Sequence, residues 1–406
     1  MTVDKAKLEE LLTRGVEDVI VRADLEKKLQ SGKKLRIKLG IDPTNPQIHI
    51  GRAAALWKLR AFQDLGHQIT LVIGTFTGVI GDASDKDSER PLVERKTIEE
   101  NMQTYAKQIG KILDMNKVEL YYNGDWFDKM PLQKFFALTQ LFTIQQMTER
   151  ENFAKRIEAG KPVGIHETLY PMLQGYDSVE MKTDVEIGGT DQLFNMLAGR
   201  EVQKAYNMPE QNVMTLHLLE GTDGRKMSSS WGNCIYINDD PIDMYGKVMT
   251  VRDELIPVYF KLCTDVPLGQ VTALEQAMAG ALVEDGMMTV FGDPANPRDT
   301  KASLAHTIVA RYYGDKAAQE AEEAWNAQFQ KGEKPKNIAT KKTKAGTVLD
   351  VVSDAFGISK SEVRRLVAQK GIKIDDKVVE DVEQKISKDC LIQVGKRRFI
   401  QLKLSK

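Results

Sequence analysis

The sequence predicts an α/β fold whose core is a doubly wound, Rossmann-like parallel sheet, and two observations lead to this prediction. Short apolar strand patterns alternate with longer helix patterns through the first half of the chain. Most strand patterns also end in turns rich in glycine, aspartate or proline. Strands that alternate with helices form a mainly parallel sheet covered on both faces. Ligands of such sheets bind beyond the carboxyl ends of the strands, so we expect a site there.

The expected elements follow from the spacing of apolar residues. Apolar and polar side chains alternate over residues 35–41, which is typical of a strand, and the proline-rich turn 42–46 ends it. Further strands are expected at residues 69–73, 118–122, 185–187 and 216–219. Helices are expected at 51–65, which is rich in alanine and leucine, and at 93–113.

The strand pattern fades after Asp240, and helix patterns interrupted by prolines follow. The expected segments are a sheet-bearing domain (1–232), a helical domain (233–330), a Lys-rich linker (331–345) and a small α+β unit (346–406). Within the last unit we expect helices at 347–355 and 359–370 and strands near 372–374, 391–394 and 399–402.

Charge is distributed unevenly along the 406 residues. The whole chain has 57 Lys and Arg against 58 Asp and Glu, but residues 331–406 have 19 against 10, a net charge of +9. A basic tail on an acidic body suggests a polyanionic partner. The alternative is a tail that only promotes solubility, and composition alone does not choose between them.

Cysteine usage and the polar N-terminus indicate a cytoplasmic protein. Cys234, Cys263 and Cys390 are odd in number and widely spaced, which argues against a disulfide framework and against a structural zinc site. The first ten residues lack the apolar core of a signal peptide. No apolar run approaches membrane-spanning length, so no membrane association is expected.

Two short motifs point to nucleotide chemistry. The first is HIGR, residues 49–52, and the second is KMSSS, residues 226–230. Chemistry at a nucleotide phosphate needs cations and N–H donors directed at oxygens that gain charge. His49 offers a side-chain donor, and Gly51 at a helix start offers accessible amides in the favourable field of the helix N-terminus. Lys226 lies in a loop that could close over the β and γ phosphates.

Another polar loop contributes Lys86 and Arg90. Each of these residues also has a simpler interpretation. A lone histidine at a helix start is more often a cap or a hydrogen-bonded core residue. A lone lysine or arginine, including Lys226, is more often a solvated charge.

The motifs together resemble those of a known family. The blocks are KLGIDPTNPQIHIGR (38–52), TGVIGD (77–82), YPMLQGYDSVE (170–180), VEIGGTDQLFN (185–195) and GRKMSSS (224–230). In this order they resemble class I aminoacyl-tRNA synthetases, specifically the bacterial tyrosyl-tRNA synthetases. The likeness extends through NPRDTK (296–301) to the C-terminus, and the combination of QGYDS with GGTDQ is more specific than either nucleotide motif.

The resemblance implies roles for individual residues. The implied catalytic residues are His49, Arg52, Lys86, Arg90, Lys226 and Ser229. The implied tyrosine-binding residues are Lys38, Asp82, Tyr170, Gln174, Asp177 and Gln192. The implied ATP- and adenylate-binding residues are Gly40, Asp42, Thr44, His49, Gly51, Gly189, Asp191, Lys226 and Met227.

Asp177 is the residue on which amino-acid specificity should depend. By resemblance it accepts the phenol hydroxyl, and a buried carboxylate would be left unpaired when phenylalanine enters. A site built to bond a hydroxyl rejects the analogue that lacks it, an effect for which enzymes of this family are the standard example. The alternative for Asp177 is a polar residue on the side of a helix. The alternative for Tyr170 and Gln174 is ordinary packing between neighbouring turns of a helix.

Two residues depart from the family pattern. Arg52 stands where a second histidine usually closes the first motif, and arginine is a longer, permanently charged donor. Lys38 stands where some members carry a tyrosine beside the substrate phenol. Asp177 must therefore account for more of the hydroxyl recognition.

Residues 346–406 resemble the small RNA-binding domain first known from ribosomal protein S-four. Four basic residues are expected on one helix and three more on a nearby hairpin. They are Lys360, Arg364, Arg365 and Lys370 on the helix and Lys396, Arg397 and Arg398 on the hairpin, and Arg397 and Arg398 are the hairpin residues expected to bind RNA. A solvated helix face is the alternative.

The resemblance implies a tyrosine–tRNA ligase that uses ATP with Mg²⁺ and has no metal held tightly by the protein. The implied partners are L-tyrosine, ATP, tRNA(Tyr) and a second copy of the chain, and the region 233–330 would contact tRNA. A tryptophan-charging relative is one alternative, disfavoured by Asp177 and the basic tail. An RNA-binding paralogue that has lost activation is another, raised by Arg52 and disfavoured by His49, Asp82 and Lys226.

Overall fold

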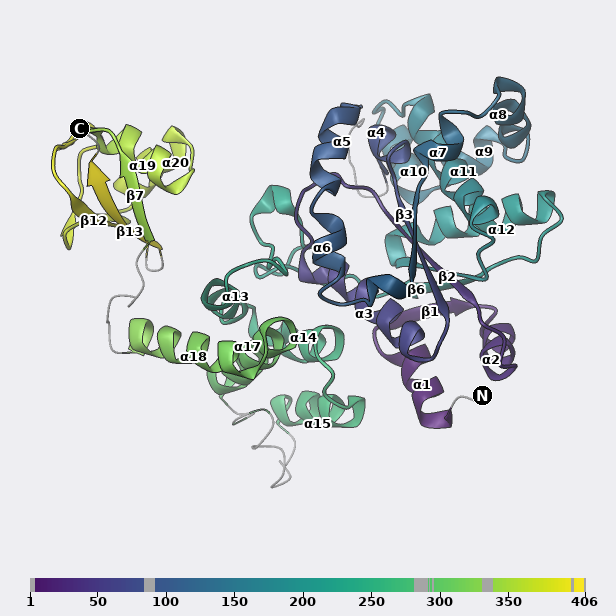
Figure 1. Ribbon diagram of the computed structural model, residues 1–406, viewed down its shortest axis with the longest axis horizontal. Helices are drawn as coiled ribbons and strands as arrows, with labels where there is room; N and C mark the ends of the chain where they lie inside the picture. Colours follow the sequence, from purple (N-terminus) through teal and green to yellow (C-terminus); the bar gives the residue numbers. More distant parts are fainter. Residues whose placement is uncertain are drawn as a thin grey trace. The chain divides into compact units, whose positions relative to one another are not determined.

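The computed structural model describes residues 4–83, 92–280, 291, 293, 296–330, 339–395 and 398–404. Contacts within the chain divide it into two compact units, Met1–Glu322 and Glu323–Lys406 (Figure 1). The first contains the large sheet and most of the helices, and the second contains a small sheet with two helices. None of the described helices is both long and apolar enough to cross a membrane.

The large unit is built around a six-stranded sheet with the order β1-β6-β5-β2-β3-β4. Neighbours from β6 to β4 are parallel, and β1 is an antiparallel edge strand against β6. The strands are β1 (Val16–Ile20), β2 (Arg36–Ile41), β3 (Gln68–Ile73), β4 (Val118–Tyr122), β5 (Val185–Gly189) and β6 (Asn212–Leu216). The predicted α/β fold class is confirmed.

The order of the strands creates a point where the chain changes direction. From β2 it proceeds to β3 and β4 on one side, and then returns to β5 and β6 on the other side of β2. The connections that leave β2 and β5 therefore diverge, which opens a crevice beyond the carboxyl ends of these two neighbours. This crevice is where the sheet can bind a ligand.

Helices cover the sheet and present the site residues (Figure 1). The main ones are α3 (Ile50–Asp64), α5 (Arg95–Met102), α6 (Tyr105–Ile109), α11 (Ile165–Glu180) and α12 (Leu193–Ala205). Helices α11 and α12 approach closely because glycines face each other. A Cβ on Gly175 would lie 3.1 Å from the backbone N of Gly199, so a larger residue would push the helices apart.

Two details of the sheet differ from the sequence prediction. The strand expected at 216–219 lies at Asn212–Leu216, and β1 was not expected. The polar residues of β6 obscure its pattern, although both are bonded: the Asn212 side chain donates to the Val21 carbonyl, and the backbone N–H of Asp18 donates to the Thr215 hydroxyl. Strand β1 is an edge strand, so it tolerates charged residues that hide it in the sequence. The helix expected at 93–113 is divided into α5 and α6.

The helices after the sheet belong to the same compact unit. They are α13 (Pro241–Val248), α14 (Ile256–Cys263), α15 (Leu268–Met278), α17 (Pro297–Tyr313) and the first half of α18 (Asp315–Gln330), whose residues from Glu323 fall in the second unit. One link to the sheet layer joins α17 to α3, where the Trp57 indole donates to the Tyr312 hydroxyl at 3.1 Å and the Arg311 guanidinium stacks 3.6 Å from the Trp57 ring. A separate helical domain at 233–330 therefore remains a proposal.

The C-terminal unit has a five-stranded sheet with the order β10-β9-β12-β13-β7. Its larger elements are β7 (Ala339–Thr343), α19 (Val348–Phe356), α20 (Lys360–Ala368), β9 (Ile372–Ile374), β12 (Cys390–Val394) and β13 (Arg398–Leu404). Short strand β10 (Lys377–Val378) lies at the edge of this sheet, and β8 (Gly346–Thr347) and β11 (Lys385–Ile386) form a separate two-stranded sheet. The core is formed by buried Val348, Val352, Val363, Ile372, Ile392 and Leu402.

The predicted linker 331–345 is partly wrong. Residues Ala339–Thr343 form β7, which pairs in parallel with β13 at the edge of the small sheet. Its threonines and lysines, in the sequence ATKKT, gave this segment the composition of a linker. Lysines are common on edge strands because they discourage pairing with other chains. Here Lys341 Nζ also donates to the Asp354 carbonyl oxygen.

Candidate active site

A cavity of about 490 Å³ lies beyond the carboxyl ends of β2 and β5. Residues from all five sequence blocks line it, although they are far apart in the chain. Those predicted from the sequence are Gly40, Asp42, Thr44, His49, Gly51, Arg52, Asp82, Tyr170, Gln174, Asp177, Gly189, Asp191, Gln192, Lys226, Met227 and Ser229. Lys86 and Arg90 lie outside the described residues, and Lys38 is not part of the lining.

His49 is the N-terminal cap of α3 and presents one nitrogen to a ligand. Its Nδ1 accepts the backbone N–H of Arg52 at 3.3 Å, so the ring proton of the neutral form is on Nε2. Burial, with the nearby charges of Arg52 and Lys226, lowers the pKa of His49 to about 3. At neutral pH the side chain is therefore an uncharged Nε2–H donor.

The loop that carries Lys226 is fastened beside His49 by backbone hydrogen bonds. Ile50 donates its N–H to the Ile235 carbonyl at 2.9 Å, and Ile237 donates to the Ile48 carbonyl at 3.0 Å. An isolated antiparallel bridge between His49 and Tyr236 thus links the first nucleotide motif to the segment that follows the second.

Asn233 holds the Lys226 loop in shape. Its side-chain amide donates to Asp223 Oδ1 at 2.8 Å and to the Lys226 carbonyl at 3.2 Å, and its Oδ1 accepts the Ser228 N–H at 2.9 Å. The close approach requires Gly221, because a Cβ there would lie 2.4 Å from the Asn233 side chain. Sequence analysis did not identify Asn233, which lies outside the motif.

Across the cavity, Lys226 meets a residue that follows β5. Its Nζ lies 2.9 Å from Asp191 Oδ2, and both side chains are partly exposed. This ion pair is accessible to solvent, so it contributes little to stability and can exchange for contacts with a ligand.

A network of carboxylates and amides forms another wall. Asp82 accepts from Arg150 Nη2 at 2.7 Å and from Gln192 Nε2 at 2.6 Å. Asn195 Nδ2 donates to both Gln192 Oε1 and Gln174 Oε1 at 3.0 Å. Each side chain is held by a neighbour, so the wall presents carboxylate and amide oxygens in fixed positions, suited to an ammonium group.

Asp42 and Tyr170 extend this wall toward β2. The Tyr170 hydroxyl donates to Asp42 Oδ2 at 2.8 Å, and Thr77 Oγ1 donates to Asp42 Oδ1 at 2.9 Å. Burial together with nearby carboxylates, Asp42 among them, raises the pKa of Tyr170 well above its ordinary value, so the phenol stays protonated. Gly74 is required beside them, since a Cβ there would lie 1.9 Å from Asp42 Oδ1.

Asp177 marks the buried end of the cavity. Its Oδ1 accepts the Trp126 indole N–H at 3.0 Å, and its Oδ2 accepts from Asn123 Nδ2 at 3.3 Å. The side chain is only 3% exposed. Burial raises the pKa of Asp177 to about 7, against the opposing effects of the Lys38 charge and the two hydrogen bonds. A carboxylate has further acceptor positions for a ligand hydroxyl.

Comparison with known proteins places the site in a family. Residues 30–330 match the tRNA synthetases class I (W and Y) family. Tyrosine–tRNA ligase from Thermotoga maritima is 41% identical over 397 residues, which cover 97% of this chain and 96% of that protein. The ligase from Shewanella oneidensis is 40% identical over 400 residues, which cover 97% of each.

The chain belongs to the tyrosine–tRNA ligase family. The resemblance predicted from the motifs is confirmed. Solved structures share the fold of the large unit. The truncated mitochondrial tyrosyl-tRNA synthetase of Coccidioides posadasii has a TM-score of 0.61 and 23% identity, covering 79% of this chain and 92% of that one. The Archaeoglobus fulgidus enzyme, solved with L-tyrosine, has a TM-score of 0.58 and 18% identity, covering 78% and 99%.

The two departures from the family pattern have different surroundings. Arg52 lines the cavity, and its Nη1 is buried without a hydrogen-bond partner among the described residues. Lys38 is completely buried, and its Nζ contacts the Gln174 carbonyl, Ser178 and Glu186 instead of the cavity. Direct contact between Lys38 and a ligand, expected from the sequence, has no support in this geometry.

Several residues that hold this ligase site together carry no motif in the sequence. Three of them lie outside the family blocks: Asn123, Trp126 and Arg150. Two others, Glu186 and Asn195, lie within a block but were assigned no role. Asn123 carried a usable signal, because it follows β4 directly and polar residues at the carboxyl ends of parallel strands often face the ligand. The others are defined only by tertiary contacts.

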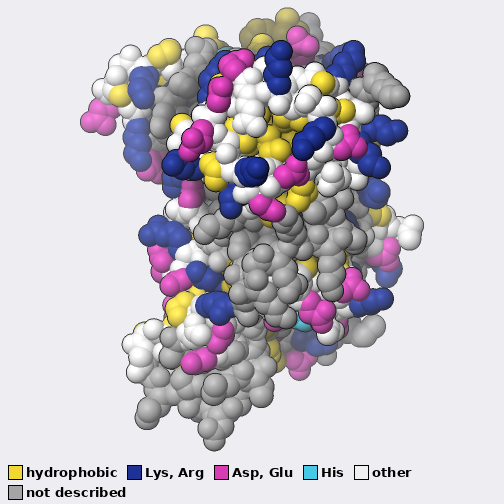
Figure 2. Space-filling model, turned by 90° about the vertical axis from the view of Figure 1, so that its left-hand side faces the viewer, with side chains coloured by type: hydrophobic (Ala, Val, Ile, Leu, Met, Phe, Trp, Pro, Cys, Tyr) yellow, Lys and Arg dark blue, Asp and Glu magenta, His cyan; other side chains and the backbone are white. Residues whose placement is uncertain are grey.

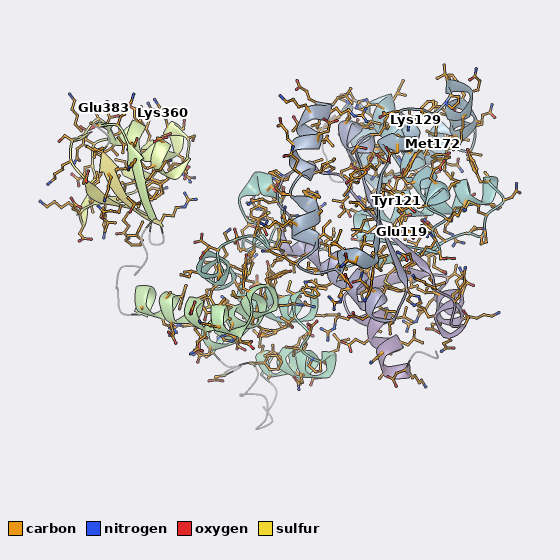
Figure 3. All side chains as sticks on the ribbon, in the orientation of Figure 1. Glu119, Tyr121, Lys129, Met172, Lys360 and Glu383 are labelled. Carbon is orange, nitrogen blue, oxygen red and sulfur yellow. The ribbon has the colours of Figure 1, made fainter. Side chains whose placement is uncertain are left out.

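The described basic residues expected to bind RNA are exposed, and three of them have acidic neighbours. Lys360 lies 2.7 Å from Asp350, Arg365 lies 2.5 Å from Glu362, and Lys370 lies 3.8 Å from Glu380 (Figure 3 labels Lys360). Arg364 and Arg398 are exposed, and Lys396 and Arg397 lie outside the described residues. Lys370 is not on the helix as predicted: α20 ends at Ala368, and Lys370 has a positive φ of 56° in the following turn.

Proposed function

We propose that this protein activates L-tyrosine with ATP and transfers the tyrosyl group to the 3′-terminal ribose of tRNA(Tyr). The observation that carries the proposal is that one cavity joins a hydroxyl acceptor to a phosphate-binding end. Asp177, held by Trp126 and Asn123, forms the first. His49 and Lys226 form the second.

Tyrosine would lie between these ends with its phenol toward Asp177. Its ammonium would be bound by Asp82, Tyr170 and Gln174, and Gln192 would orient its carboxylate. Gly40, Asp42, Thr44, Gly189 and Asp191 would line the adenosine and its ribose, beside Met227. This arrangement places the tyrosine carboxylate near the α-phosphate of ATP.

In the first step a tyrosine carboxylate oxygen bonds to the α-phosphorus, and the bond to the pyrophosphate oxygen breaks. The Nε2–H of neutral His49, the backbone at Gly51, and the charges of Arg52 and Lys226 would stabilise the phosphate oxygens. Ser229, with Lys86 and Arg90, completes the proposed set of phosphate ligands. Positioning and charge stabilisation supply the catalysis, without a covalent enzyme intermediate. Mg²⁺ is expected to arrive with ATP and to offset phosphate charge.

In the second step the terminal ribose hydroxyl of tRNA bonds to the tyrosyl carbonyl carbon, and AMP leaves. We propose that residues 233–330 and the C-terminal unit from 346 hold the tRNA. The exposed residues Lys360, Arg364, Arg365, Lys370 and Arg398, with Arg397, would contact its backbone. Several of them must exchange a carboxylate partner for phosphate. On the face drawn in Figure 2, basic and acidic side chains are likewise interspersed.

A homodimer is part of the proposal, and exposed apolar side chains support it. Leu132, Phe136, Ile144 and Ile165 are 57–80% exposed, and they lie on or at the start of α8 (Leu132–Thr139), α9 (Ile144–Thr148) and α11. Helices α8 and α9 both pack against α11. Clustered exposed apolar residues are typical of protein interfaces. Since charged tRNA is consumed by ribosomes, the cytoplasm is the proposed compartment.

Amino-acid-dependent exchange of pyrophosphate into ATP tests the proposed function. Purified protein should catalyse exchange with tyrosine and show little with tryptophan or phenylalanine. Preference for tryptophan would favour the sibling activity. Absence of exchange with every amino acid would favour an RNA-binding protein that has lost activation.

A further inference from the structure

A buried ion pair lies under the tyrosine end of the cavity, where the family pattern is broken. Lys38 on β2 and Glu186 on β5 are register partners on adjacent parallel strands. Their Nζ and Oε1 atoms lie 2.9 Å apart, and their side chains are 0% and 1% exposed. Two charges removed from water this completely are costly unless every polar atom is bonded, so the pair needs a compensating role.

We propose that Lys38 and Glu186 are positioning residues for tyrosine recognition: they fix the turn of α11 that carries Gln174 and Asp177 and place a cation beside the Asp177 carboxylate. The inference rests on the proposed function, since it takes Asp177 as the hydroxyl acceptor. It assigns to Lys38 an indirect role in place of contact with the substrate.

Lys38 grips one turn of α11. Its Nζ donates to the Gln174 carbonyl and to Ser178 Oγ, both at 2.8 Å, and the third N–H faces Glu186. An ammonium has three donors, so all are used and none is left for a ligand. Asp177 lies between the two gripped residues of the helix, and its position therefore depends on Lys38.

Glu186 sets the orientation of the Gln174 side chain. Its Oε1 accepts from Gln174 Nε2 at 3.0 Å, and its Oε2 accepts from Gln211 Nε2. Asn195 Nδ2 donates to Gln174 Oε1 at 3.0 Å. If the Gln174 amide were flipped, its N–H groups would face the Asn195 N–H and its oxygen would face the Glu186 carboxylate. The observed orientation is therefore fixed. The second lone pair of Gln174 Oε1 is then available for the substrate ammonium.

The two charges act on Asp177 with opposite sign. Lys38, from β2, favours the ionised carboxylate and lowers its pKa, whereas Glu186, from β5, raises it. The other groups around Asp177 are Asn123 and Trp126, which donate to it, and the protonated Tyr170 on its own helix. If the role of Lys38 and Glu186 is merely structural, replacing either residue should be harmful in the same way. If the role is electrostatic, the two replacements should shift the pKa of Asp177 in opposite directions.

The test uses the full-length protein with Lys38→Met, Glu186→Gln and the double variant Lys38→Met/Glu186→Gln. Tyrosine- and phenylalanine-dependent pyrophosphate exchange is measured from pH 5.5 to 8.5, together with the thermal unfolding midpoint. Lys58→Met is the matched control, because Lys58 is the other buried lysine among the described residues and donates to the Leu11 carbonyl at 2.7 Å, away from the cavity.

In Lys38→Met, we expect the acid limb, which is the fall of kcat/KM for tyrosine at low pH, to move to a pH about one unit higher. The ratio of the kcat/KM values for tyrosine and phenylalanine should then be about tenfold lower at pH 6.5. Glu186→Gln should move the limb downward. The double variant buries no lone charge, so it should recover thermal stability, and its acid limb should return toward that of the parent because two opposing charges are removed together. Its tyrosine-to-phenylalanine ratio at pH 8.5 should stay below that of the parent, because the bonds from Lys38 to α11 are lost. Lys58→Met should leave the ratio and the limb unchanged.

Shifts of the acid limb in the same direction for Lys38→Met and Glu186→Gln would overturn the inference, as would a double variant with the full tyrosine-to-phenylalanine ratio of the parent protein at pH 8.5. If Lys38→Met does not fold, the double variant and Glu186→Gln decide by the same criteria. If the parent protein shows no tyrosine-dependent pyrophosphate exchange, the proposed function fails. If the parent shows exchange but the acid limbs of the variants do not move, only the role of Lys38 and Glu186 fails.

Discussion

Replacing Asp177 by alanine should reduce discrimination between tyrosine and phenylalanine. The carboxylate already accepts two N–H groups, from Trp126 and Asn123, and its remaining acceptor position is proposed to receive the phenol hydroxyl. Tyrosine would lose one charge-assisted hydrogen bond in a buried site, worth about 2–3 kcal/mol. Phenylalanine has no such bond to lose. The ratio of kcat/KM values should therefore fall about 30- to 160-fold.

The assay is pyrophosphate exchange with each amino acid, and Asp177→Asn is the matched control. Asparagine keeps the volume but not the charge, so its ratio should fall between those of the parent and Asp177→Ala. Because burial raises the pKa of Asp177 to about 7, protonation on the acid side removes the acceptor. The parent ratio should accordingly rise with pH through about 7. A ratio that is unchanged by Asp177→Ala and flat with pH would refute the assignment.

Three further predictions concern the phosphate end and the C-terminal unit. Lys226→Met should slow adenylate formation by about 10²- to 10³-fold in single-turnover assays while tyrosine affinity in equilibrium dialysis stays constant, as expected for a preorganised cation. His49→Ala should lose about 1 kcal/mol of stability because it loses the helix cap, and His49→Asn should largely restore that stability. In the folded parent His49 stays neutral, whereas in the unfolded chain it takes up a proton below pH 6.5. The alanine variant should therefore lose less stability than the parent when the pH is lowered from 6.5. Truncation after Gln330 should leave pyrophosphate exchange intact, reduce tRNA charging and give a shallower salt dependence of tRNA binding, and equal salt slopes would show that the tail only aids solubility.

The fold and the motif residues were accessible to sequence reasoning because strong patterns report them. Apolar runs mark the buried parallel strands, and the HIGR and KMSSS motifs mark turns that follow them. Strand β1 was missed because an edge strand tolerates charge, and β7 was missed because its polar sequence, ATKKT, resembles a linker. In both cases the surrounding sheet decides the structure, and local composition does not.

Positioning residues were harder to recognise than ligand-facing ones. Asn195 and Glu186 each act through two or more partners from different elements, and Asn233 acts by holding the loop that precedes it, so their function depends on the folded contacts. Lys38 illustrates the reverse difficulty. Its place in a family block suggested contact with the substrate, but it occupies the helix-facing side of β2, where its ammonium is already saturated.

A crystal structure with a non-hydrolysable tyrosyl-adenylate analogue would test the central claim most directly. The account predicts that the phenol oxygen lies within hydrogen-bonding distance of Asp177, that Lys226 has exchanged Asp191 for the ligand, and that Lys38 contacts only protein. An analogue bound with its aromatic ring away from Asp177, or one contacted directly by the Lys38 ammonium, would contradict it.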